Sequence, residues 1–441
     1  MIKLIVIGKI RLILGAFLLF LLAHILKVSL IVPLFLLSLV VYLQFSLPNL
    51  RTKPYNLLNL SLLYVIIFVT SYAIIKQGWP VFCIPFCAIP MLAILLFNNT
   101  AIALLLTFAS ALSVGNIAGN NLLGLLFLIS GIFSCLLAKD ARRRSVIIRS
   151  GLLVGLLQAS ALFLIERLSV QHAQDYIILV LNGIVSAMIV TAVLPIFEYL
   201  FSTVTNISLL ELADFNSPLL QRMIIEAPGT YHHSLIVGNL SDAACKAIGA
   251  HELLARIGAY YHDIGKLAKP DYFSENQPQN ENRHDDLAPG MSKLIIMNHV
   301  KEGVELANKY RLNPAIIEFI QQHHGSSLVY FFYRRALENA EVNQEVKEEG
   351  FRYPGPKPNT KETAIVLLAD SVEAAARCLK DPNPQKIEEL VHKIINNKFI
   401  DGQLDECDLT LKDIEKISTV FIRILTGIYH GRTTYPEKSD N

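Results

Sequence analysis

The chain has 441 residues, of which 53% are hydrophobic, and its formal net charge is only +2. Its mean hydropathy of +0.44 is too high for a soluble protein of this length, which excludes a wholly soluble enzyme. Residues 1–200 carry 13 Lys/Arg and 4 Asp/Glu, whereas residues 201–441 carry 26 and 33. The first part therefore has the composition of a membrane protein. The mildly acidic second part argues against a surface that binds a nucleic-acid polymer.

Cysteine usage limits the kinds of site that the chain can hold. The six cysteines form no CxxC pair and no even framework in a secreted region, which favours a reducing compartment and excludes a zinc knuckle.

Apolar stretches follow one another from residue 10 to residue 200, most of them close to the roughly 20 residues that cross a bilayer as a helix. No small-residue cleavage pattern follows the first of them, so a cleaved signal peptide is disfavoured. The break at Lys27 is tight, and one long helix kinked near Pro33 would leave seven spans instead of eight. We place the stretches at 10–26, 28–47, 57–76, 80–97, 100–118, 121–138, 147–167 and 176–200.

The orientation of these spans follows from the basic residues between Lys139 and Arg149, because loops rich in Lys and Arg face the cytoplasm. Counting outward places everything after residue 200 in the cytoplasm, with the N-terminus inside for eight spans and outside for seven. The spans contain no chain of ionisable residues, which disfavours transport.

The sequence of the second half predicts an all-α domain, because its apolar residues recur at spacings of three and four and no run alternates in the manner of a β-strand. Pro228-Gly229-Thr230 is expected to interrupt the pattern, and the loops 270–289 and 350–360 separate helices. We expect helices at 232–249, 251–264, 289–310, 313–325, 327–340, 361–379, 384–397 and 410–430. The expected domains are an N-terminal hydrophobic segment (1–27), a membrane bundle (28–201), a connector (202–228), the all-α domain (229–436) and a tail (437–441).

The stretch AYYHDIGK places an imidazole and a carboxylate side by side after a small and apolar segment, which is typical of a metal site. Further His and Asp residues lie in segments that otherwise read as apolar helix. Five imidazoles and two carboxylates suit a pair of metal ions about 3.5–4 Å apart, and a nitrogen and oxygen donor set without thiolate favours Fe or Mn over Zn. The candidate ligands are His233, His262, Asp263, His299, His323, His324 and Asp370.

On these residues the chain resembles the HD-domain metal-dependent phosphohydrolases, and more closely the membrane-anchored 7TM-HD cyclic-di-AMP phosphodiesterases of bacteria, the PgpH type. The resemblance covers nearly all of residues 28–436. It implies a multi-pass protein of the bacterial inner (cytoplasmic) membrane with an HD domain in the cytoplasm. The motifs that carry it are PGTYHHSLIVGNL, ARIGAYYHDIGK, YFSENQ, HVKEGVELA, QHHG, FRYPGPKPNTKETAI, LADSVEAAAR and DGQLDEC.

The resemblance also implies roles for these residues. One metal would be held by His233, His262, Asp263 and Asp370, and the second by His299, His323 and His324, with Asp263 as the bridge and a catalytic group. A dimetal-bound hydroxide would open one phosphodiester of cyclic-di-AMP to give linear pApA. His232 would support the site, and Lys266, the lysine of HDxGK, would meet a phosphate oxygen or position the bridging carboxylate.

Loop residues extend the candidate site toward the substrate. Basic side chains from the proline-rich loop would cap the anionic ligand, and the other polar or aromatic side chains would stack on adenine or bond to it. The candidates are Tyr272, Asn276, Arg352, Tyr353, Lys357 and Lys361.

The sequence departs from its relatives in two places. The family carries a large extracellular region after its first membrane helix, whereas here the apolar stretches are almost continuous at Lys27. The related HD-GYP enzymes for cyclic-di-GMP carry HHE and a GYP triplet, whereas this chain reads HHGSSLVYFFY, which disfavours that substrate.

Alternative functions are a non-catalytic membrane receptor for a nucleotide and an HD phosphohydrolase acting on another nucleotide. The expected partners are a cyclic dinucleotide and membrane lipid, and a homodimer is left open.

Overall fold

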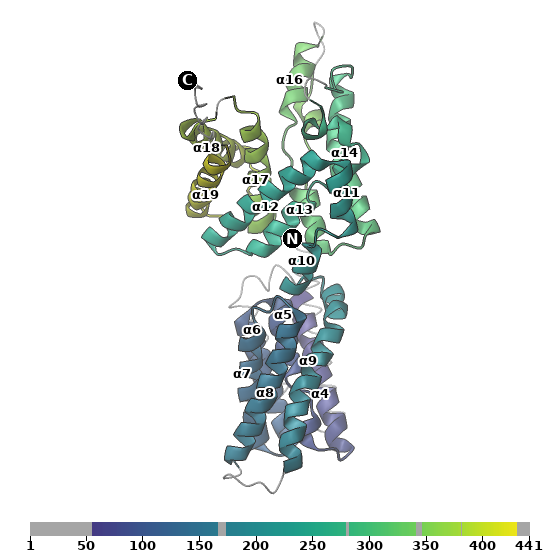
Figure 1. Cartoon of the computed structure of the whole chain (residues 1–441), viewed down its shortest axis with the longest axis vertical. Coiled ribbons are helices and arrows are strands. Elements are labelled where there is room, and N and C mark those ends of the chain that lie inside the picture. The colour runs from purple at the N-terminus through teal and green to yellow at the C-terminus, as the bar shows by residue number, and fades with distance from the viewer. Residues whose placement is uncertain (1–54, 166–172, 279–281, 341–345, 381, 430–441) are drawn as a thin grey trace, which may run out of the picture. The chain divides into compact units, whose positions relative to one another are not determined.

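The computed structural model describes residues 55–165, 173–278, 282–340, 346–380 and 382–429. Within these ranges the regular elements are helices, with a single isolated bridge between Leu328 and Arg352, so the all-α expectation is confirmed for them (Figure 1). The chain divides into two compact units between Ser208 and Leu209.

In the described residues of the first unit, 55–165 and 173–208, five helices are long and apolar enough to cross a membrane. The expected spans at 57–76, 100–118, 121–138, 147–167 and 176–200 each coincide with one of these helices. The expected spans at 10–26 and 28–47 lie outside the described residues. The five helices are α4 (Tyr55–Lys76), α6 (Thr100–Ile117), α7 (Asn121–Ala138), α8 (Arg144–Ile165) and α9 (Ala173–Phe201).

The helix expected at 80–97 is interrupted. The turn η1 (Val81–Cys83) is followed by an extended residue, Ile84, and only then by α5 (Ala88–Phe97), which is buried over Ala88–Leu96. Proline disfavours a helical conformation in the residue before it, which accounts for a break at Ile84-Pro85. The amide nitrogen of Asn182 on α9 donates to the carbonyls of Phe82 and Ile84, so part of the interrupted backbone is satisfied inside the protein.

Close approach of α8 and α9 depends on glycine. A Cβ on Gly151 would lie 2.4 Å from the Gly183 carbonyl oxygen, and one on Gly155 would lie 2.7 Å from the Val180 carbonyl oxygen. This is the small-residue packing that lets membrane helices touch through their backbones. It places Asn182, next to Gly183, where it can reach the break before α5.

Two helices, α17 (Lys361–Arg377) and α12 (Pro228–Ile248), lie at the centre of the second unit. In α17 the six residues 364–369 are each 0% exposed, so this helix is apolar on all sides and must be covered by others. It packs against α12, and three further helices pack around the pair: α13 (Glu252–Tyr261), α18 (Pro384–Ile400) and α19 (Leu411–Tyr429). The other described helices are α10 (Asn206–Leu212), which crosses the division between the units, α11 (Pro218–Glu226), α14 (Pro289–Lys309), α15 (Pro314–Gln322) and α16 (Tyr330–Glu338).

Several expected boundaries move. Pro228-Gly229-Thr230 forms the first turn of α12 instead of interrupting the chain, because proline at the first helical position needs no hydrogen-bonded N–H. The helix expected at 251–264 ends at Tyr261 and is followed by η2 (Ile264–Ala268), and the helix expected at 313–325 ends at Gln322. The loops that follow Pro270 and precede Thr360 contain the short turns η3 (Pro270–Tyr272), η4 (Ser274–Asn276) and η5 (Glu348–Phe351).

Candidate metal centre

Three of the seven candidate ligands are oriented by their own helices. The imidazole Nδ1 of His262 donates to the Ala259 carbonyl oxygen at 2.6 Å. His323 donates in the same way to the Ile320 carbonyl, and His299 to the Ile296 carbonyl. Each bond is to the carbonyl three residues earlier, which fixes the ring and leaves Nε2 as the free donor atom for a cation.

The ligand atoms form two groups that share one carboxylate. His233, His262, Asp263 and Asp370 make one group, and Asp263, His299, His323 and His324 make the other, with the donor atoms of each group within 4.8 Å of one another. Asp263 Oδ2 lies 3.2 Å from His262 Nε2, whereas Oδ1 lies 3.3 Å from His299 Nε2. The two oxygens of Asp263 therefore face different groups, as a bridging ligand must. The structure brings all seven predicted ligands together.

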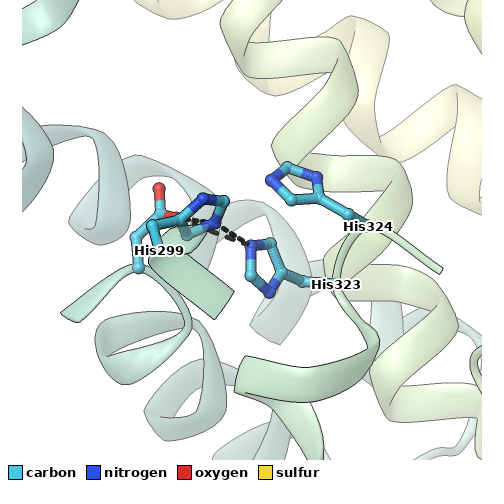
Figure 2. Close-up of side chains that lie close together, drawn as sticks. His299, His323 and His324 are labelled. Atoms are coloured by element: carbon cyan, nitrogen blue, oxygen red, sulfur yellow. Dashed lines mark hydrogen bonds and ion pairs between the residues drawn. The ribbon is translucent and has the colours of Figure 1, made fainter. Parts of the chain in front are cut away.

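The rings of the second group converge from three directions (Figure 2). His299 Nε2 lies 3.1 Å from His323 Nε2. Both rings donate through Nδ1, so in their neutral forms both Nε2 atoms carry lone pairs, and two facing lone pairs repel unless a cation lies near them. His324 turns its Nδ1 toward Asp370 Oδ2, at 3.5 Å.

Buried polar atoms without partners show that the residues fit divalent metals. Within the described residues, His262 Nε2 and Asp263 Oδ1 are buried and have no hydrogen-bond partner. Leaving such atoms unsatisfied costs about 1–3 kcal/mol each, which a coordinated cation removes. The donor set is imidazole and carboxylate without thiolate, which suits first-row divalent ions.

Charge in the centre is arranged for ligation. Burial lowers the pKa of His299 to about 4 and holds the pKa of His324 well below its ordinary value, so both rings are neutral at pH 7. Burial by itself would raise the pKa of Asp263 and of Asp370, but contacts with His262 and Lys266 for the first, and with His233 and His262 for the second, outweigh it and hold both well below the usual range. The same contacts raise the pKa of His233 and of His262 against the effect of burial, so these two rings release a proton when a cation binds. Neutral imidazoles and ionised carboxylates are the forms that bind metal.

Comparison with known proteins finds matches in both halves of the chain. Residues 22–205 match the family described as 7TM receptor with intracellular HD hydrolase, and residues 230–375 match the HD domain family. The chain is 38% identical over 423 residues to the cyclic-di-AMP phosphodiesterase PgpH of Bacillus subtilis, covering 92% of this chain and 59% of the relative. It is 39% identical over 392 residues to PgpH of Listeria monocytogenes, covering 87% of this chain and 54% of the relative.

This chain belongs to the 7TM-HD family. It spans 59% and 54% of the length of the two relatives just named. A crystal structure of the L. monocytogenes PgpH HD domain in complex with cyclic-di-AMP is 48% identical in sequence, with a TM-score of 0.47, and covers 48% of this chain and 99% of that one.

Lys266, the lysine of the HD motif in this 7TM-HD chain, contacts the shared carboxylate. Its ammonium lies 2.7 Å from Asp263 Oδ2 and 2.6 Å from Glu275 Oε1. Burial lowers the pKa of Lys266, but the two carboxylates outweigh it and raise the pKa above its ordinary value, so the group stays charged. The same pairing lowers the pKa of Glu275 to about 2, against the effect of burial. Lys266 is thus placed to hold Asp263 in its bridging orientation.

The YFSENQ segment is tied to the start of α12, which carries His233. Asn276 Oδ1 accepts from the Thr230 N–H at 3.1 Å, and its Nδ2 donates to Thr230 Oγ1 at 2.9 Å. A Cβ on Gly229 would lie 1.8 Å from the Glu275 carbonyl oxygen, so only glycine permits this approach. Tyr272, from the same segment, packs edge-on against His284, a residue outside both metal groups.

Of the candidates in the proline-rich loop, Tyr353 contacts the metal centre. Its ring is buried and stacks on His324 with centroids 4.4 Å apart. The three cations are paired with acids: Arg352 with Asp401 at 2.8 Å, Lys357 with Asp405 at 3.6 Å and Lys361 with Asp413 at 3.0 Å. Their predicted contacts with substrate stay predictions. His232 is exposed, because adjacent helical positions point about 100° apart and its neighbour His233 faces inward.

Sequence reasoning missed three residues that hold the ligands. Glu275 shares the Lys266 ammonium, Glu373 bonds to His233, and Gln403 Oε1 accepts from the Ser326 N–H at 2.9 Å. Gln403 is 0% exposed and packs on Gly325, so it fixes the turn that follows His323 and His324. A usable signal existed for Glu373, which follows Asp370 by one helical turn in an otherwise small and apolar segment.

Proposed function

We propose that this chain is an integral-membrane, metal-dependent phosphodiesterase that hydrolyses cyclic-di-AMP to pApA. The observation that carries the proposal is the sharing of Asp263 between two ligand groups. Sites of two divalent ions bridged in this way are common in enzymes that cleave phosphate esters. The proposed substrate is taken from the relatives named cyclic-di-AMP phosphodiesterase, to which most of this chain is similar in sequence.

The reaction adds one water across one phosphodiester of the ring, breaking a P–O bond to the ribose 3′ oxygen and leaving a 5′ phosphate on the linear product. When bound, a pair of divalent metals supplies a strong nucleophile from water near neutral pH and neutralises charge on the phosphoryl oxygens. His233, His262 and Asp370 would hold one ion, His299, His323 and His324 the other, and Asp263 both. Fe or Mn suits this donor set best.

Residues around the candidate ligands restrain the position of the shared carboxylate. Lys266 and Glu275 restrain Asp263, so the shared carboxylate need not reorganise during the reaction. Tyr353 lines the His324 side, where it could contact a base or phosphate. We retain Tyr272, Asn276, Arg352, Lys357 and Lys361 as proposed substrate contacts; for the three cations this requires that part of each charge remains available beside its acidic partner.

The proposed location of the enzyme in the membrane rests on its apolar helices and on the distribution of its basic residues. The five apolar helices and the basic segment between α7 and α8 support a multi-pass protein of the bacterial inner membrane, with seven or eight spans and the HD domain in the cytoplasm. We propose domains at 1–27, 28–201, 202–228, 229–436 and a tail at 437–441. Membrane lipid is a partner, and assembly as a homodimer is an additional proposal.

The test uses the full chain purified in detergent and loaded with Mn²⁺ or Fe²⁺. Cyclic-di-AMP and cyclic-di-GMP are supplied separately, and products are identified by chromatography and mass spectrometry. We expect pApA from cyclic-di-AMP in the parent chain and in Glu305→Gln, which changes an exposed acid on α14, but none in Asp263→Ala. Binding of cyclic-di-AMP to the metal-loaded chain with no product after hours would refute the enzyme and favour the receptor. Faster turnover of another nucleotide would refute the substrate.

A further inference from the structure

A buried carboxylate outside the predicted ligand set lies against the first metal group. Glu373 is on α17, one turn after Asp370, and is 1% exposed among small and aliphatic neighbours. Within the described residues no lysine or arginine lies in salt-bridge range of it, and its ion-pair contact is with His233. Burying a carboxylate without a lysine or arginine beside it costs free energy, so we expect Glu373 to have a specific role.

That role is suggested by the way His233 differs from the other ligands. In His262, His299 and His323, the Nδ1–H donates a hydrogen bond to the backbone carbonyl three residues earlier in the chain. The Nδ1 of His233 instead bonds to Glu373 Oε2, across from α12 to α17, while its Nε2 lies 3.0 Å from Asp370 Oδ1. The orientation of this ring therefore depends on a carboxylate that is 140 residues away in the sequence.

The second oxygen of Glu373 is held by another helix. The Tyr429 hydroxyl, on the last described turn of α19, donates to Glu373 Oε1 at 3.2 Å. One oxygen thus orients the imidazole, and the other is fixed from outside the metal centre. Carboxylates that accept a hydrogen bond from the second ring nitrogen of a ligating histidine fix its tautomer and raise its basicity toward the metal.

We propose that Glu373 is a positioning residue for His233, and that Tyr429 positions Glu373. Together they set the affinity of the group His233, His262, Asp263 and Asp370 for its cation. The inference rests on the metal centre of the proposed function. It assigns to α19, the last helix of the described residues, a contribution to metal binding, although no candidate ligand lies on that helix.

The experiment measures metal binding by the full chain in detergent, independently of activity. The parent chain, Glu373→Gln, Tyr429→Phe and Glu362→Gln are dialysed against a series of buffered free Mn²⁺ concentrations, and bound metal per chain is determined by mass spectrometry. Glu362→Gln is the matched control: it makes the same chemical change on α17, where an amide oxygen can still accept from the His251 N–H. Circular dichroism melting reports whether each variant is folded.

We expect Glu373→Gln to weaken one of the two sites by roughly 10- to 100-fold and to leave the other unchanged. Tyr429→Phe should weaken the same site by a smaller factor, and Glu362→Gln should match the parent. Raising free Mn²⁺ should restore both metals and turnover in Glu373→Gln, which loss of structure alone would not permit. Parent-like affinity at both sites in Glu373→Gln overturns the inference.

Should Glu373→Gln fail to fold, Tyr429→Phe carries the test, and parent-like affinities in that variant overturn the inference. Failure of the proposed function is distinguishable. A parent chain that binds two metals without forming pApA refutes the reaction but leaves this measurement valid, whereas a parent chain that binds no metal refutes both.

Discussion

Gly265 offers a direct test of how tightly the metal centre is built. It lies two residues after Asp263 in η2, which packs against α14. A Cβ at this position would lie 1.8 Å from the His299 carbonyl oxygen and 2.5 Å from the Gly303 nitrogen. Both atoms belong to the backbone, so no side-chain rotation can relieve the overlap in Gly265→Ala.

The size of the displacement decides the outcome. Ordinary contact begins near 3.4 Å, so the His299 backbone must retreat by about 1.6 Å from the turn that carries Asp263. Metal sites tolerate departures of only about 0.2 Å from their preferred ligand distances. We therefore expect Gly265→Ala to lose the second metal, with affinity reduced more than roughly 100-fold, and to lower the free energy of unfolding by about 1–3 kcal/mol.

The assay combines bound Mn²⁺ per chain with urea unfolding of the purified chain. Gly290→Ala, at the start of α14, is the control, because a Cβ there meets nothing within 4 Å. Its metal content should be unchanged and its stability altered by no more than about 1 kcal/mol. Two metals bound at parent affinity in Gly265→Ala would refute the view that this glycine sets the distance between Asp263 and His299.

Five further substitutions test other parts of the structure. His262→Ala or Asp263→Ala should lower cyclic-di-AMP turnover more than roughly 100-fold while circular dichroism shows unchanged helical content; retained turnover contradicts the ligand assignment. His324→Ala should reduce one metal more than the other in elemental analysis, and equal loss of both counts against two separate groups. Gln403→Ala should lower the free energy of unfolding by about 1 kcal/mol in urea titrations, since the partly buried N–H of Ser326, in the turn after the HH pair, loses its acceptor; an unchanged midpoint contradicts this. Asn182→Leu should lower the unfolding temperature in detergent, at a cost of about 1–2 kcal/mol, because two carbonyls before α5 lose their donor; parent-like melting would show that they find another.

The first unit shows where composition is sufficient to predict a helix and where it is not. Composition alone identifies α4, α6, α7, α8 and α9, since a run of about 20 apolar residues has few other stable forms. The same composition at 80–97 produced a wrong expectation of one continuous helix. The break there is tolerated because Asn182, about 100 residues later, satisfies carbonyls that the interrupted backbone leaves free.

What the sequence alone determined is the chemistry of the centre. The His and Asp residues in apolar segments were therefore predicted to be metal ligands, and the structure brings all seven candidates into two groups around Asp263. Only the tertiary structure decided what holds them. Glu373 reaches His233 over 140 residues, and Gln403 reaches Ser326 over 77. Such contacts depend on which helices pack together, and the spacing of residues within one helix does not determine that.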